Sequence, residues 1–277
     1  MTIHIRRLHG RPLSVMLTVL ILFTLLWPFD MLIARMQRGA TTVSDWPGVY
    51  SYRRHAPATD VEAYVRPDLA QRMAYLRPTI LAAAARHNHA ELSGMTDQEF
   101  AAVIALIIYN ENFGWLEDDV PPLRHFTPLY QDLQRQLNHR RPGSNFSVWP
   151  VNLRPSVAIE ILEQRLPLPD GTWAELPLHV AGSRIDPDEY ADRAALMAAV
   201  TDEISRDDLA VAYLAANLER GLFRAAYEDV AVDWRILAAW HNQGLVDPEA
   251  IRTNSTASDY LRRAAVYLPI AEDLIIR

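Results

Sequence analysis

The stretch from Thr96 to Glu111 constrains the fold of this chain more than any other. It opens with Thr-x-x-Glu, in which Thr96 and Glu99 can each satisfy a backbone N–H at the start of a helix. Apolar residues then recur at helical spacing, at Phe100, Val103, Ile104, Ile107 and Ile108. Glu111 continues the same row, and the following Asn-Phe-Gly is typical of a helix end. The pattern predicts an amphipathic helix whose apolar face ends in a single carboxyl group.

The predicted position of Glu111 favours the neutral form of its side chain. Burial disfavours a charge there, and the negative end of the helix dipole acts in the same direction. A carboxyl group that keeps its proton near neutral pH can serve as a general acid. The periodicity leaves an alternative open, in which Glu111 pairs with an arginine or reaches solvent at the end of the helix.

Most of the remaining sequence also follows a helical pattern. Ala and Leu are abundant and glycine is sparse, with 10 in 277 residues, which favours helix over strand. A turn at Pro169-Asp170-Gly171-Thr172, flanked by apolar residues, predicts a small β-hairpin between residues 165 and 185. We therefore expect a mainly α fold, one helical domain with a minor hairpin, in which Pro269 ends the last regular helix. Further helices are expected near 60–75, 78–91, 127–138, 155–165, 187–200, 206–220, 233–242 and 258–268.

The N-terminal segment carries a separate signal. Residues 13–27 form a run without charge, preceded by three arginines, and the run extended to residue 34 approaches the roughly 20 residues that a membrane span needs. The arginines favour an N-terminus on the inside, and the lack of an Ala-x-Ala cleavage site favours an uncleaved anchor over a signal peptide. The rest of the chain is then expected outside the cytoplasmic membrane. The predicted divisions are a cytoplasmic basic stub at 1–12, a transmembrane anchor or signal segment at 13–34, a linker at 35–60 and a domain at 61–277.

Charge and composition exclude several classes of function. Residues 1–40 carry five arginines and one aspartate, so the net charge of −7 for the whole chain leaves −11 on the remainder. An acidic body argues against nucleic acid as a partner. The absence of cysteine excludes disulfides, thiolate metal sites and thiol nucleophiles. His87 and His89 would point apart on one helix and there is no His-Glu-x-x-His, so neither a metal nor a cofactor is expected.

Four segments resemble, in the same order, those of lytic transglycosylases and goose-type lysozymes. Residues 107–113 (IIYNENF) resemble the family's catalytic helix end, and residues 147–158 (SVWPVNLRPSVA) are similar to its G-L-M-Q-I-x-P-x-T-A stretch. Tyr213-Leu214 looks like its A-x-Y-L helix, and residues 238–244 (AAWHNQG) resemble A-A-x-Y-N-x-G. The resemblance spans about residues 100–270. It implies a lysozyme-like helical domain that acts on the glycan strands of peptidoglycan.

The resemblance implies that Glu111 acts first as acid and then as base on the bond between N-acetylmuramic acid and N-acetylglucosamine. A lytic transglycosylase needs only this carboxyl group, because the acetamido group and the 6-hydroxyl of the substrate complete a 1,6-anhydro product. A hydrolytic lysozyme needs a second carboxylate, about 5–5.5 Å away for retention or about 6.5–9.5 Å away for inversion. None of the candidates is singled out, which favours the one-carboxylate mechanism. These candidates are Glu117, Asp118, Asp119, Asp186 and Asp188.

The same resemblance implies a set of substrate-binding residues. They are Ser147, Trp149, Asn152, His241 and Asn242. Three of them depart from the family pattern: Trp149 stands in place of Gly, Asn152 in place of Gln, and His241 in place of Tyr. Neutral His241 could hydrogen-bond Glu111 or be a packing residue. The departures keep a second hypothesis open, a catalytically silent lysozyme-like module that binds glycan or an envelope partner. A third is a membrane-anchored helical protein with an accidental resemblance.

Overall fold

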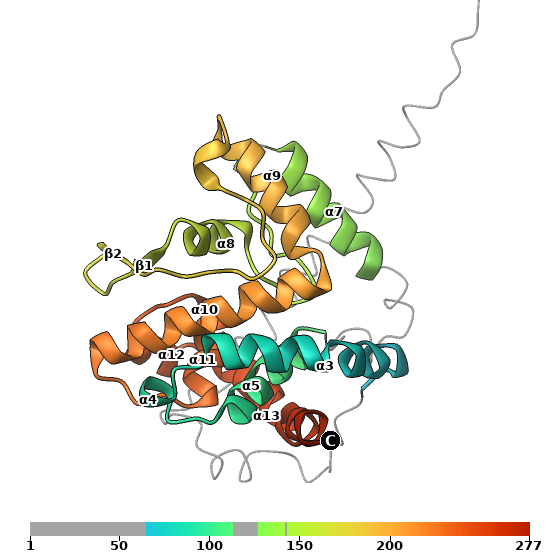
Figure 1. Ribbon diagram of the computed structural model, residues 1–277, viewed down its shortest axis with the longest axis vertical. Helices are drawn as coiled ribbons and strands as arrows, with labels where there is room; N and C mark the ends of the chain where they lie inside the picture. The colour runs from blue at the N-terminus through green and yellow to red at the C-terminus, as the bar shows by residue number, and fades with distance from the viewer. Residues whose placement is uncertain (1–64, 113–126, 142) are drawn as a thin grey trace, which may run out of the picture. The chain divides into compact units, whose positions relative to one another are not determined.

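The computed structural model describes residues 65–112, 127–141 and 143–277 (Figure 1), all within the unit Asp45–Arg277. The predicted anchor and linker lie outside these ranges, as do the candidate carboxylates Glu117, Asp118 and Asp119. The predicted mainly α class is confirmed. In the three described ranges, no helix combines the length and the apolar character needed to cross a membrane.

Ten α-helices, one 3-10 helix and two short strands make up the described chain. Their bounds are α3 (Pro67–His87), α4 (Ala90–Ser93), α5 (Asp97–Glu111), α7 (Thr127–Arg140), α8 (Pro155–Leu162), β1 (Arg165–Pro167), β2 (Trp173–Glu175), η2 (Pro187–Glu189), α9 (Arg193–Ile204), α10 (Asp207–Glu228), α11 (Trp234–Gln243), α12 (Pro248–Arg252) and α13 (Ser255–Ile276).

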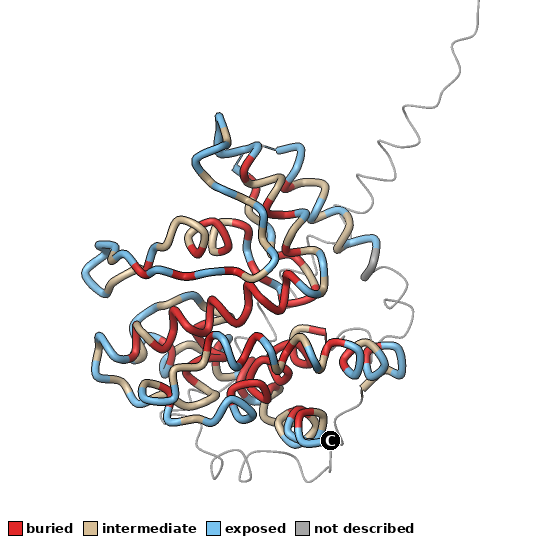
Figure 2. The backbone as a smooth tube through the Cα atoms, viewed as in Figure 1, coloured by how far each residue is buried: buried red, intermediate tan, exposed pale blue. Residues whose placement is uncertain are grey.

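Helix α5, which carries Glu111, is buried along most of its length. It begins at the predicted capping box, with Thr96 Oγ1 accepting from the Glu99 amide at 3.2 Å and the Glu99 carboxylate accepting from the Thr96 amide at 2.7 Å. Every residue from Phe100 to Asn110 is buried (Figure 2), so the prediction of an amphipathic helix is wrong. Alanines occupy part of the face that was expected to be polar, and helices α13, α3 and α11 pack around it. Small side chains permit that close approach on several sides.

Helices α3 and α13 are each longer than predicted: α3 spans the gap expected between residues 75 and 78, and α13 continues through Pro269, where its end was predicted. Helix α3 runs through Pro78, and α13 runs through Pro269 to Ile276. A proline inside a helix removes a backbone donor and crowds the carbonyl four residues earlier. Apolar contacts on both sides of Pro269 offset this cost, because α13 packs closely on α5. The buried residues of α13 are Ala257, Tyr260, Leu261, Ala264, Tyr267, Ala271 and Ile275.

Helix α10 runs through the middle of the described fold, with α3, α5, α11 and α13 on one side and α7, α8, α9 and the hairpin on the other (Figure 1). Gly221 lets α11 approach it, since a Cβ at that position would lie 3.0 Å from Leu237 Cδ2. Strands β1 and β2 pair antiparallel with Pro167 opposite Trp173, which confirms the predicted hairpin. Helix α10 therefore contacts both α11 and strand β1 of the hairpin.

Candidate functional site

The loop between α7 and α8 is folded against the end of α5. Its residue Val148 donates its amide to Leu153 O at 2.8 Å and closes the turn between them. Asn112, the residue after α5, donates from Nδ2 to Pro150 O at 2.8 Å. Asn152 adopts a positive φ of 55°, a conformation that asparagine tolerates better than most residues. The loop therefore presents the Asn152 side chain toward the C-terminal end of α5.

Glu111 receives a hydrogen bond from this loop. Asn152 Nδ2 donates to Glu111 Oε2 at 2.8 Å, and the Glu111 side chain is only 7% exposed. Among the described residues, no arginine forms an ion pair with Glu111. Within that part of the chain, the carboxyl group is thus shielded from solvent and oriented by a neutral amide rather than by a cation.

His241 of α11 lies on the other side of the same loop. Its Nε2 donates to Val151 O at 2.7 Å, which places the proton on Nε2. Glu111 Oε1 is 3.8 Å from the same nitrogen, which is too long for a hydrogen bond. Burial lowers the pKa of His241, against the opposing effects of the Glu111 charge and the Val151 carbonyl, so the ring is neutral. Of the two alternatives for His241, the direct hydrogen bond to Glu111 is not formed: the buried ring lies near Glu111 but bonds to the loop.

Tyr260 of α13 adds a neutral hydroxyl beside Glu111 that the sequence analysis did not single out. Burial raises the pKa of Tyr260 well above its usual value, and the negative charge of Glu111 acts in the same direction. The hydroxyl therefore keeps its proton. No motif marks this tyrosine in the sequence; it reaches Glu111 only because α13 packs along α5.

Two buried polar atoms of residues near Glu111 have no hydrogen-bond partner in the described part of the chain. They are Asn112 Oδ1 and His241 Nδ1, whereas the Tyr260 hydroxyl interacts with both Glu111 and the Asn110 side chain. Each buried and unsatisfied group costs about 1–3 kcal/mol, so such groups are rarely clustered in a purely structural core. The two atoms give the surroundings of Glu111 acceptors that can take part in binding or proton transfer.

A pocket of about 330 Å³ opens beside the loop, between α8, the hairpin, α10 and α11. Three predicted residues line it, namely Asn152, His241 and Asn242. Ser147 is half-buried on the same loop but does not line the pocket, and neither does Glu111. The structure thus brings Asn152 and His241 together at Glu111 and puts Asn242 on the adjoining pocket wall.

Trp149 points to another neighbour. The Arg72 guanidinium lies 3.9 Å from the centre of its ring, and Arg72 Nε donates to Asp207 Oδ2 at 2.6 Å. The ring is therefore stacked against a paired arginine of α3 and does not line the pocket. The bulk that distinguishes this residue from the family's glycine is accommodated against α3.

Glu160 and Arg220 are charged residues of the pocket that the sequence analysis missed. Arg220 Nη2 donates to Glu160 Oε2 at 2.8 Å, and the Arg220 side chain is 1% exposed. Burial lowers the pKa of Arg220, and the pairing with Glu160 opposes that shift. A signal was present, because Glu160 is the only charged residue in the otherwise apolar α8. Asp186 and Asp188, the candidate carboxylates within the described ranges, line a different pocket.

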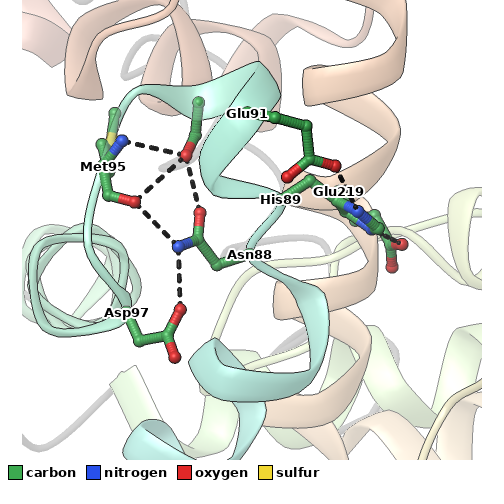
Figure 3. A network of polar contacts seen from close by, with 7 residues as sticks. Asn88, His89, Glu91, Met95, Asp97 and Glu219 are labelled. Carbon is green, nitrogen blue, oxygen red and sulfur yellow. Dashed lines mark hydrogen bonds and ion pairs between the residues drawn. The ribbon is translucent and has the colours of Figure 1, made fainter.

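His87 and His89 converge on one carboxylate, contrary to the expectation that they point apart. His87 Nδ1 lies 2.7 Å from Glu219 Oε2. His89, which Figure 3 shows beside Glu219, has its Nε2 2.6 Å from Glu219 Oε1. The expectation is wrong because α3 ends at His87 and His89 lies in the extended link to α4. In the described part of the chain, no group of three or more histidine or acidic side chains is arranged to hold a metal ion. The cluster joins the α3–α4 link to α10.

The comparisons with known proteins add no relative to this picture. No protein-family model, no curated protein and no solved structure matches the chain.

Proposed function

We propose that this protein cleaves the bond between N-acetylmuramic acid and N-acetylglucosamine in peptidoglycan, with Glu111 as a single acid/base in a lysozyme-like domain. The observation that carries the proposal is the 2.8 Å hydrogen bond from Asn152 to the shielded Glu111 carboxyl group. It joins two of the segments on which the family resemblance rests, and His241 from a third lies 3.8 Å from the same carboxyl group. The proposal includes attachment to the membrane through residues 13–34, with the domain outside the cytoplasmic membrane.

In the proposed reaction, Glu111 gives its proton to the glycosidic oxygen while the bond from that oxygen to C1 of the muramic acid residue breaks. The acetamido group of the same sugar assists at C1. The Glu111 carboxylate then takes the proton of the 6-hydroxyl as its oxygen bonds to C1, which yields a 1,6-anhydro sugar and restores the acid. Asn152 keeps the carboxyl group in one orientation through both steps.

The neutral surroundings of Glu111 support this role. His241 is uncharged because burial lowers its pKa, and Tyr260 keeps its proton because its pKa is raised. A protonated histidine at 3.8 Å would instead hold Glu111 as a carboxylate and oppose proton donation. His241 and Tyr260 therefore place no positive charge beside the Glu111 carboxyl group.

The one-carboxylate form of the reaction is supported by the positions of the other acids. Asp186 and Asp188 line a different pocket. Glu160 lines the pocket beside Asn152, but its Oε2 is held by Arg220. A hydrolytic mechanism would normally use a second free carboxylate. Among the described residues, none lies in that pocket.

A second candidate function is glycan binding without cleavage. The observation that favours it is that Asn152, His241 and Asn242 line the pocket whereas Glu111 does not. A ligand seated there would contact the predicted binding residues without direct contact with the acid.

Incubation with purified peptidoglycan separates the two candidates. The full-length protein in detergent is expected to release muropeptides that carry 1,6-anhydro ends, identified by mass spectrometry. Glu111→Gln should reduce this release by at least about 100-fold, because general acid–base catalysis contributes roughly that much.

The matched control is Glu189→Gln, which makes the same change at an exposed glutamate outside the pocket and should release products at the parent rate. Retained release by Glu111→Gln contradicts the proposed mechanism. No release by either protein, with binding to peptidoglycan preserved, favours the silent module.

A further inference from the structure

An exposed tryptophan stands at the rim of the 330 Å³ pocket. Trp173 of β2 lines the pocket and is 49% exposed, although it is one of the largest apolar side chains. The hairpin fixes its backbone by pairing it with Pro167, and the Arg165 guanidinium lies 5.9 Å from the centre of its ring. A held, exposed indole offers a flat apolar face to a ligand.

Other residues that line the pocket supply polar groups of both kinds. Nδ2 of Asn217 and Nδ2 of Asn242 are donors that contact no acceptor among the described residues. Asn152 Oδ1 and Glu160 Oε1 are acceptors that receive no hydrogen bond there. The buried Arg220 guanidinium holds the half-buried Glu160 carboxylate in place, so the acceptor is oriented before any ligand arrives.

This combination defines the chemistry of a ligand. A pyranose ring has a C–H face that can lie on an indole and an equatorial edge of hydroxyl groups that need both donors and acceptors. The pocket volume falls at the lower end of the roughly 300–1,000 Å³ usual for small-molecule sites, as a single sugar residue requires.

We infer that the pocket is a subsite for one 2-acetamido-2-deoxy sugar, stacked on Trp173 and read by the side-chain amides of Asn152, Asn217 and Asn242. The choice of an acetamido sugar rests on the proposed function, whereas the stacking and the polar edge come from the geometry of the pocket. Trp173 then determines affinity and specificity for the glycan without taking part in bond cleavage.

Calorimetric titration with chitotetraose, a chain of four N-acetylglucosamine residues, tests this subsite. The full-length protein carries Glu111→Gln in every sample, so that binding is measured without turnover. Trp173→Ala should weaken binding about tenfold, the loss expected for one aromatic contact, and Trp173→Phe should weaken it less. Cellotetraose, which lacks the acetamido groups, should bind more weakly than chitotetraose to the parent.

Tyr227→Ala is the matched control, because Tyr227 is an exposed aromatic residue (61%) that does not line the pocket. It should bind chitotetraose like the parent. The inference is overturned if Trp173→Ala also binds like the parent, if Tyr227→Ala weakens binding equally, if cellotetraose binds as well, or if the parent does not bind chitotetraose.

The outcomes for the subsite and for the reaction are separable. Suppose that binding depends on Trp173 but the protein with Glu111 intact releases no peptidoglycan fragments. This result supports the subsite and overturns the proposed cleavage. Release of anhydro fragments that depends on Glu111, with binding indifferent to Trp173, does the reverse.

Discussion

Asn152 combines a backbone requirement with a chemical one. Its φ of 55° suits asparagine or glycine, and its amide donates to Glu111 at 2.8 Å. The sequence analysis identified the residue from its place in a motif. Neither the backbone angle nor the atom that the amide contacts follows from that motif, because both depend on how the loop closes onto α5.

Two substitutions at Asn152 separate these requirements. Asn152→Ala should lower the free energy of unfolding by about 1–2 kcal/mol, since it loses the hydrogen bond and strains a positive φ. Asn152→Gly relieves the strain, so it should be the more stable of the two by urea denaturation. Both should be equally poor at releasing peptidoglycan fragments, because both leave Glu111 without its donor. Full activity of the glycine variant would show that the amide has no role in the reaction.

His241 should make the stability of the protein depend on pH. Its pKa is lowered in the folded state, so below the unfolded value of about 6.5 the unfolded chain binds a proton that the folded chain does not. Its contribution is therefore lost as the pH falls through about 6.5 and below. The parent should lose more free energy of unfolding than His241→Gln between pH 7.5 and about pH 5.5, as measured by urea titration. Equal losses in the two proteins would contradict a buried neutral imidazole.

At the scale of elements, local signals were reliable where they rest on backbone chemistry. The capping box at Thr96 and the turn before β2 follow from side chains that bond their own neighbours, and both were predicted. The burial of α5 on several sides and the continuity of α13 through Pro269 depend on packing between distant helices. Periodicity in one segment does not contain that information.

Pro269→Ala should stabilise the protein. The proline is exposed inside α13, so alanine restores a backbone donor without removing a buried contact. We expect the free energy of unfolding to rise by about 1 kcal/mol or more. The gain is partly offset because alanine gives the unfolded chain more conformational entropy than proline does. Thermal and urea unfolding measure the change. A loss of stability would mean that Pro269 itself supports the packing of α13 on α5.

At the scale of the whole described fold, the site combines residues from segments far apart in the chain. Glu111, Asn152 and His241 were predicted because a family pattern names all three segments, and the structure brings them within hydrogen-bond or near-contact distance. Tyr260 and Arg220 were missed because no local pattern marks them and only packing brings them to the site. The convergence of His87 and His89 on Glu219 was missed for a related reason, since it depends on where α3 ends. Glu160 was missed although it is the only charged residue of α8.

The mass of the released muropeptides tests the central claim most directly, with the digestion carried out in heavy-oxygen water. A reaction closed by the substrate's own 6-hydroxyl yields products one water lighter than hydrolytic ones and free of solvent oxygen, and Glu111→Gln should abolish them. Heavy oxygen at C1 in products of the parent protein would contradict the one-carboxylate mechanism, and anhydro products released equally by Glu111→Gln would contradict the role of Glu111.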